Sequence, residues 1–340
     1  MLQGHGDDVH FFNDIIANFS TNVWYKSNFE KLAAYIRDNL SIIKNYPEVS
    51  AESLKELLSK HHNINQSQII ITNGATEAIY LISQTYNSKK STILCPTFAE
   101  YEDSSKINNH KILYKKWDDL DKNSIFNSDL VWICNPNNPT GDILKKNDLD
   151  TLILANQNSL FIIDEAYIDF TTEISSITEN INNYNNVIII KSLTKNFAIP
   201  GLRLGYIISS TNLIEKLTLF KSPWSVNSIA ILAGKFILNN LKDFKIPLTT
   251  YLKSAHDFKE MINKLDYFEV VQSNTTFFLV KLLKGNSKDL KNYLANTFKI
   301  LIRDASNFRG LNSSYIRLAT QSKEKNLLLI KALKEWSTHI

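Results

Sequence analysis

The chain has 340 residues, of which 44% are hydrophobic and 21% charged, and its formal net charge is +4. This length predicts one large domain and a smaller one, and the scattered basic residues argue against a nucleic-acid-binding patch. No apolar run approaches the roughly 20 residues of a membrane span, no signal peptide begins the chain, and two cysteines without metal-type spacing favour neither disulfides nor zinc. We therefore predict a soluble, cytoplasmic protein without a metal site.

From residue 46 to 236, short apolar runs alternate with helix-like stretches. This alternation is typical of parallel strands joined by crossover helices, and it predicts an α/β domain with a mainly parallel seven-stranded sheet. The expected strands are Ile69–Thr72, Thr92–Cys95, Lys111–Tyr114, Leu130–Cys134, Leu160–Asp164, Val187–Lys191 and Leu204–Ile208.

After Pro247 the pattern changes to a helix-like stretch followed by short apolar runs, which predicts a smaller α+β domain. We expect residues 1–45 and 237–340 to form this domain together, because the N-terminal stretch has no strand-helix alternation of its own. The expected elements are a helix over Leu248–Leu265 and strands over Phe268–Gln272, Phe277–Val280, Ile300–Arg303 and Tyr315–Ala319.

A lysine flanked by hydroxyls follows the apolar run Val187–Ile190. Lys195 lies close to Ser192 and Thr194, and Arg203 follows within the same segment. A Schiff-base lysine needs a partly desolvated amine, and a phosphate-bearing cofactor needs hydroxyls and a cation. A single lysine after a strand is more often a solvated surface residue, so this pattern alone does not decide its role.

This segment resembles the S-x-[ST]-K…G-x-R-x-G pattern of the class I/II aminotransferase family, which are fold-type I enzymes that use pyridoxal 5′-phosphate (PLP). The resemblance extends over at least six motifs in family order and implies a PLP-dependent enzyme. It implies that Lys195 carries PLP as a Schiff base, while Ser192, Thr194 and Arg203 bind the cofactor phosphate.

Two motifs at other strand ends add to the resemblance. Asp164 ends an apolar strand and, by itself, is a plausible helix cap, but in the family this aspartate pairs with the pyridine nitrogen. Tyr167 and Asn138, the latter in a proline-rich turn, resemble the residues that bind the phenolic oxygen of PLP. We take Lys195, Asp164 and Tyr167 as the catalytic residues.

The turn that begins with Thr72 joins a strand to a helix, and free N–H groups at such a helix start favour a phosphate. By resemblance, Gly74, Ala75 and Thr76 bind the cofactor phosphate there. Tyr101 resembles the aromatic residue that stacks on the pyridine ring; an isolated tyrosine would more often pack in the core.

Two motifs lie near the ends of the chain. Tyr46 resembles the tyrosine that reaches the PLP phosphate of a neighbouring subunit, which implies a homodimer. Arg317 resembles the arginine that binds the substrate carboxylate, although an arginine in a strand is usually a surface ion-pair partner.

Within the family, the chain is most similar to threonine-phosphate decarboxylases and histidinol-phosphate aminotransferases, and several segments favour the decarboxylase. We predict a small amino acid as substrate, either phosphorylated or not, with Arg303, Asn22 and His5 at its far end. In the segment His5-Gly6-Asp7-Asp8, an acid replaces a glycine of the decarboxylase pattern, and an added carboxylate would repel a phosphate. An unphosphorylated amino acid and transamination therefore stay open.

Two other classes of protein were weighed. A nicotinamide-dependent dehydrogenase would share the α/β pattern, but the chain contains no G-x-G-x-x-G motif. A non-catalytic PLP-binding module would be expected to lose Lys195 or Asp164, and both are present. An amino-acid-converting enzyme is the better interpretation.

Overall fold

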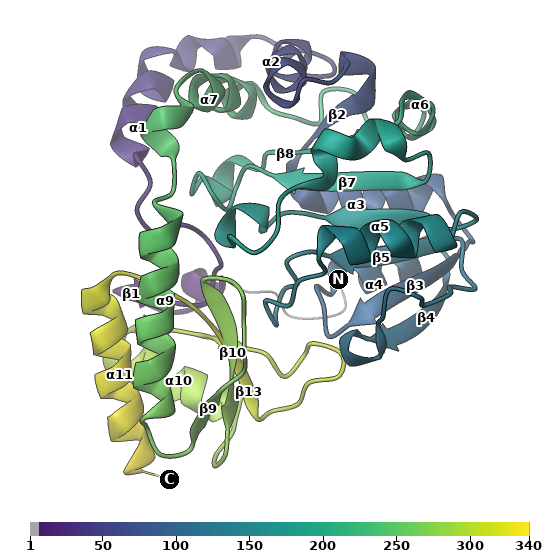
Figure 1. The fold of residues 1–340 in the computed structure, drawn as a ribbon. Helices are drawn as coiled ribbons and strands as arrows, with labels where there is room; N and C mark the ends of the chain where they lie inside the picture. The colour runs from purple at the N-terminus through teal and green to yellow at the C-terminus, as the bar shows by residue number, and fades with distance from the viewer. Residues whose placement is uncertain (1–6, 340) are drawn as a thin grey trace.

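The computed structural model describes residues 7–339, and its centre is a seven-stranded sheet in the order β2-β8-β7-β6-β5-β3-β4 (Figure 1). Six strands run parallel, and β8 runs antiparallel to both neighbours. The first and last residues of all seven strands lie within two residues of the predicted ones, so the predicted sheet is confirmed. They are β2 (Ile69–Thr72), β3 (Lys90–Cys95), β4 (Lys111–Lys116), β5 (Leu130–Cys134), β6 (Leu160–Asp164), β7 (Val187–Ser192) and β8 (Gly205–Ser209).

Helices cover both faces of this sheet because its central strands are apolar on both faces. Val187 and Ile189 of β7 pack with α1, α2, α5 and α7, whereas Ile188 and Ile190 pack with α3, α4 and α6. The helices are α1 (Phe29–Asp38), α2 (Glu52–His62), α3 (Gly74–Thr85), α4 (Glu100–Ile107), α5 (Lys146–Ala155), α6 (Thr211–Thr218), α7 (Ser228–Asn239) and the short α8 (Leu241–Phe244).

A smaller four-stranded sheet, in the order β12-β13-β10-β9, packs against three helices in the lower left of Figure 1. All of its strand pairs are antiparallel. Its elements are α9 (Leu248–Asn263), β9 (Phe268–Val270), β10 (Phe277–Leu282), α10 (Ser287–Phe298), β12 (Arg303–Asp304), β13 (Tyr315–Ala319) and α11 (Lys323–Ser337).

The strand predicted over Ile300–Arg303 is two strands in two different sheets. β11 (Ile300–Leu301) pairs in parallel with β1 (Ala17–Asn18), whereas β12 pairs with β13. The apolar run in the sequence does not predict that the strand changes its partner. Its first half forms hydrogen bonds with β1 and its second half with β13, and these lie in different parts of the chain.

The N-terminal stretch lies against two parts of the molecule. Its strand β1 joins the C-terminal region, but α1 packs on α7, where Tyr35 stacks on Phe236 with ring centroids 4.3 Å apart. The domain division at residues 45 and 236 stays a prediction. Short 3-10 helices cover Asp8–Phe11, Leu40–Lys44, Gln66–Gln68, Trp117–Asp119, Ile168–Phe170, Ile177–Asn183 and Pro200–Leu202.

Residues 7–339 contain neither a candidate membrane-spanning helix nor a metal-type cluster of side chains. No helix there is both long and apolar enough to cross a membrane. In the same stretch, no cluster of three His, Cys, Asp or Glu side chains is arranged to hold a metal ion. Both cysteines are free and buried.

Candidate active site

The register of the large sheet brings the predicted motifs to one edge. Asp164 is opposite Cys134 of β5, and Ser192 is opposite Gly205, which is in turn opposite Thr72. These residues lie at the carboxyl ends of parallel strands or beside them on β8, the edge at which open α/β sheets bind ligands. Segments that are far apart in the sequence therefore meet at one place.

Asp164 is a buried carboxylate held by two hydrogen bonds. Its Oδ1 accepts from the Ala166 N–H at 2.9 Å, and its Oδ2 accepts from the Tyr101 hydroxyl at 2.7 Å. Burial raises the pKa of Asp164, and the bond from Tyr101 opposes this rise. The carboxylate is thus oriented before any ligand binds.

Tyr101, which the resemblance places on the pyridine ring, donates its hydroxyl to Asp164 and packs one face of its ring on Trp132. Its ring stacks on Trp132 with centroids 5.3 Å apart, Phe98 meets it edge-on at 5.9 Å, and only 1% of the residue is exposed. Tyr101 is therefore the hydrogen-bond donor of Asp164, and its predicted stacking on the pyridine ring stays a prediction.

Lys195 lies in the turn after β7, and its carbonyl accepts the Trp24 N–H at 2.9 Å. Burial lowers the pKa of its amine to about 8, and the positive charges of Arg317 and Arg203 add to the effect. A larger fraction of this amine is therefore unprotonated near neutral pH than in an ordinary lysine, as a nucleophilic lysine requires.

Arg203 and two hydroxyls surround the start of α3. A Cβ atom on Gly74, whose φ is +79°, would lie 2.5 Å from Nη2 of Arg203, so the guanidinium lies directly over the first turn. Ser192 and Thr194 are joined by a 2.8 Å hydrogen bond between their hydroxyls. The first N–H groups of α3, including those of Ala75 and Thr76, have no partner within the helix. This arrangement suits a phosphate.

Arg317 is buried between two other elements of the site. Its Nη1 donates to Oδ1 of Asn138 at 2.6 Å, and its Nη2 donates to the carbonyl of Ser20. Burial lowers its pKa to about 10, and the charge of Arg303 contributes. The two bonds hold the guanidinium in place while its Nε has no hydrogen-bond partner in the described chain.

Asn22 and Tyr167 lie beside one another. The side-chain oxygen and nitrogen of Asn22 are both buried, and neither has a hydrogen-bond partner of good geometry within residues 7–339. Burial raises the pKa of Tyr167, and the nearby Asn22 amide opposes this rise. Buried polar groups are normally satisfied. The unpartnered polar atoms of Asn22 and Arg317 are thus available to bind a polar ligand.

Arg303 lies opposite Arg317 in the pairing of β12 with β13. Directly opposed residues of antiparallel strands project from the same face, so the two guanidinium groups are neighbours. Arg303 is 7% exposed and donates to the carbonyl of Asp304 at 2.6 Å and to Oδ1 of Asn307 at 2.8 Å. The structure thus provides two buried, fixed cations side by side.

The acidic pair near the N-terminus is already bonded to other groups. Asp8 forms an ion pair with Lys291, and Oδ1 of Asp7 accepts a hydrogen bond from Asn18 at 2.9 Å. The expected repulsion of a substrate phosphate by Asp8 is reduced, since Lys291 balances its charge. The predicted substrate-binding residue His5 lies outside the described residues.

Tyr46 does not join the other predicted residues. It is 87% exposed and lies next to Trp224, with ring centroids 5.8 Å apart. The sequence also missed the segment Ser20–Trp24 as a backbone support of Arg317 and Lys195. Side-chain patterns do not reveal such contacts, because main-chain groups make them.

Comparison with known proteins identifies the class. The chain matches the family Aminotransferase class I and II over residues 15–333. The chain therefore belongs to this family, and it is a PLP-dependent enzyme, as predicted.

Two groups of enzymes within this family are similar to the chain. The crystal structure of L-threonine-O-3-phosphate decarboxylase from Porphyromonas gingivalis aligns with a TM-score of 0.91 and 38% identity, over 95% of this chain and all of that one (100%). The threonine-phosphate decarboxylase of Salmonella typhimurium is 29% identical over 96% of this chain and 93% of its own length. A histidinol-phosphate aminotransferase of Methanosphaera stadtmanae is 30% identical over 92% and 88%. The predicted resemblance to both groups is confirmed.

Proposed function

We propose that this PLP enzyme decarboxylates an O-phosphorylated hydroxy amino acid of the phosphothreonine class. The observation that carries the proposal is the opposition of Arg303 and Arg317. Two buried guanidinium groups on one face suit a substrate with two separate anions, a carboxylate and a phosphate, because a guanidinium binds either group with two parallel hydrogen bonds. The similarity to L-threonine-O-3-phosphate decarboxylase supports the same assignment.

The described residues fit PLP. The first turn of α3, the hydroxyl pair of Ser192 and Thr194, and Arg203 would hold its phosphate. Asp164 would face the pyridine nitrogen, and Tyr167 with Asn138 the phenolic oxygen. PLP would supply an electron-withdrawing ring, which weakens the α-carbon bonds of a substrate whose amine has replaced Lys195 on the cofactor.

The residues of the chain determine which of these bonds breaks. Arg317 would bind the carboxylate and Arg303 the phosphate, so the substrate would be fixed at both ends and its rotation about the α-carbon set. After carbon dioxide leaves, the α-carbon needs a proton. The Lys195 amine, with its pKa near 8, is suited to supply that proton at near-neutral pH.

Transamination of histidinol phosphate is the second candidate. Histidinol-phosphate aminotransferases match the chain about as well as curated threonine-phosphate decarboxylases do, with identities of 30% and 29%. Arg303 would suit the phosphate of either substrate. In transamination Lys195 would instead remove the α-proton.

A direct assay separates the two reactions. PLP-loaded protein is incubated with O-phosphothreonine, and in parallel with histidinol phosphate plus 2-oxoglutarate. We expect carbon dioxide and a phosphorylated amino alcohol in equal amounts from the first, and no glutamate from the second. Glutamate without carbon dioxide would overturn the decarboxylase proposal.

We also propose a cytoplasmic homodimer in which Tyr46 completes the partner's site. Tyr46 is 87% exposed, and its ring lies beside that of Trp224, which is 48% exposed. Exposed apolar patches commonly mark protein interfaces. Size-exclusion chromatography with light scattering measures the oligomeric state, and an active monomer would exclude the dimer.

A further inference from the structure

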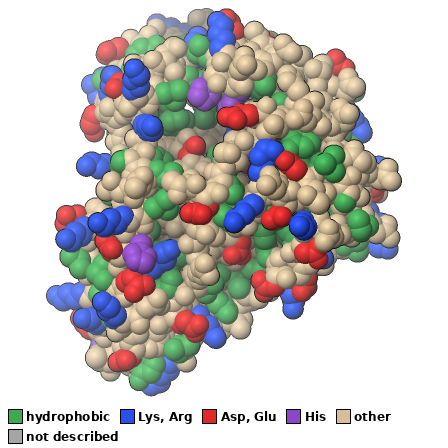
Figure 2. Space-filling view, viewed as in Figure 1, with side chains coloured by type: hydrophobic (Ala, Val, Ile, Leu, Met, Phe, Trp, Pro, Cys, Tyr) green, Lys and Arg blue, Asp and Glu red, His purple; other side chains and the backbone are tan. Residues whose placement is uncertain are grey.

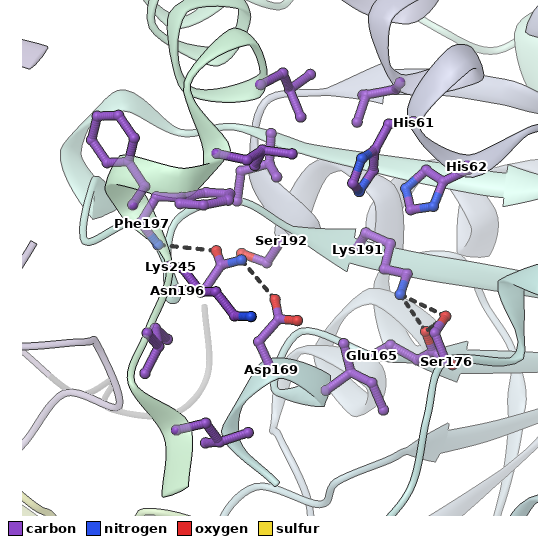
Figure 3. A pocket seen from close by; sticks show the side chains of 18 of the residues that line it. His61, His62, Glu165, Asp169, Ser176, Lys191, Ser192, Asn196, Phe197 and Lys245 are labelled. Carbon is purple, nitrogen blue, oxygen red and sulfur yellow. Dashed lines mark hydrogen bonds and ion pairs between the residues drawn. The ribbon is translucent and has the colours of Figure 1, made fainter. Parts of the chain in front are cut away.

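A cavity lies beside the segment that carries Lys195, and both Ser192 and Asn196 line it (Figure 3). Its volume of about 610 Å³ lies within the usual range for small-molecule sites. Glu165 and Lys191 line this cavity together with Ser192, which is also a predicted ligand of the cofactor phosphate. Asp164, which directly precedes Glu165, does not line it.

The floor of the cavity carries no unbalanced charge. Lys191 forms an ion pair with Glu165 at 2.5 Å and donates to the Ser176 hydroxyl at 2.8 Å, as Figure 3 shows. His62 bonds to the Tyr206 hydroxyl at 2.8 Å, and burial lowers the pKa of His62 to about 3, which keeps its imidazole neutral. The charged groups that could bind a ligand therefore lie at the rim of the cavity.

The rim of the cavity has more free cations than free anions. Lys242 and Lys245 are exposed, and neither has an acidic partner within residues 7–339. His61 points into the cavity and makes no hydrogen bond to the described part of the chain. The acid at the rim is Asp169, whose Oδ2 accepts from Asn196 at 2.6 Å. Two unpaired lysines against one bonded carboxylate favour an anion.

The walls of the cavity are apolar. They include Leu58, Phe197, Leu238, Leu241, Phe244 and Ile246. We propose that this cavity binds an organic anion, namely an apolar body that bears one carboxylate or phosphate group held by Lys242 and Lys245. Asn196 lines the cavity and directly follows Lys195, so the ligand would contact the residue next to the cofactor-binding lysine in the sequence.

The fluorescent probe anilinonaphthalene sulfonate, an apolar body whose single anionic group is a sulfonate, tests the site in the PLP-loaded wild-type enzyme. We expect saturable binding of one dye per chain, weakened about tenfold or more by Lys242→Glu combined with Lys245→Glu. Lys122→Glu combined with Lys288→Glu is the matched control, since these exposed lysines lie outside the cavity and the change in net charge is the same. Equal dissociation constants for the two double variants would overturn the proposal.

Competition identifies the ligand class. Octanoate and octyl phosphate should displace the dye, whichever of the two anionic groups is preferred, and octylamine should not. Displacement by octylamine as strong as by octanoate would show that Asp169 governs the cavity and would refute an anion site. Displacement by O-phosphothreonine would place the dye in the active site, with the same consequence.

Discussion

Arg303 and Arg317 face each other across the antiparallel strands β12 and β13, with Arg317 fixed by Asn138 and the carbonyl of Ser20. Like charges are costly side by side in a buried place, and burial lowers the pKa of both guanidinium groups. Such a pair is stabilised when two anionic groups bind. This relationship underlies the proposed preference for a phosphorylated amino acid.

Arg303→Ala should weaken the binding of O-phosphothreonine by roughly 2–5 kcal/mol, as when a buried charge loses its partner. Threonine binding should change far less, because it has no phosphate. Steady-state kinetics with both substrates measure the difference, and Arg309→Ala provides a control at a surface arginine that pairs with Glu102. Equal losses for both substrates would show that Arg303 does not bind phosphate.

Lys195→Ala should abolish covalent PLP binding and turnover while the protein stays folded, because the residue is only half-buried and lies in a turn. Borohydride reduction followed by mass spectrometry detects any PLP that is still attached, and circular dichroism checks the fold. Covalently retained PLP in this variant would contradict the assignment of Lys195.

Asp164→Asn should retain PLP but lose most of the rate, because a neutral amide does not stabilise a protonated pyridine nitrogen. Tyr101→Phe removes one neutral hydrogen-bond donor to the same carboxylate and should cost less, about 0.5–1.5 kcal/mol in activation free energy. Near-normal turnover in Asp164→Asn would reduce Asp164 to a structural role.

The pH dependence of PLP uptake tests the environment of Lys195. Only the unprotonated amine attacks an aldehyde, so uptake by the apoenzyme should accelerate with rising pH and level off above the lysine pKa of about 8. Arg317→Gln removes a neighbouring positive charge and should move the midpoint to higher pH. Stopped-flow absorbance measures the rate, and a wild-type midpoint near the ordinary value of 10.5 would contradict the lowered pKa of Lys195.

Mixed dimers test the proposed contribution of Tyr46. Tyr46→Ala and Lys195→Ala should each be nearly inactive alone, since one lacks the borrowed tyrosine and the other lacks the lysine. After subunit exchange, a heterodimer contains one site with both defects and one with neither, so activity should return toward half of the wild-type value per heterodimer. A mixture that stays inactive despite proven exchange would argue against a shared site.

The sequence alone determined the large sheet, the family and the cofactor. Strands such as β5, β6 and β7 are apolar on both faces, so their hydrophobic runs are visible without any tertiary contact. Asp164 ends β6 and Lys195 follows β7 within the next turn, and the carboxyl ends of parallel strands meet at one edge. The cofactor was predicted because these motifs, in their order along the chain, resemble those of the class I/II aminotransferase family.

Only the tertiary structure decided which groups meet across the chain. It showed that Ile300–Arg303 is divided between two sheets and that Tyr101 bonds Asp164. It also placed Arg303 opposite Arg317. Strand register and long-range hydrogen bonds depend on how separate segments pack against one another. The hydrophobic periodicity of one segment does not specify which other segment it pairs with.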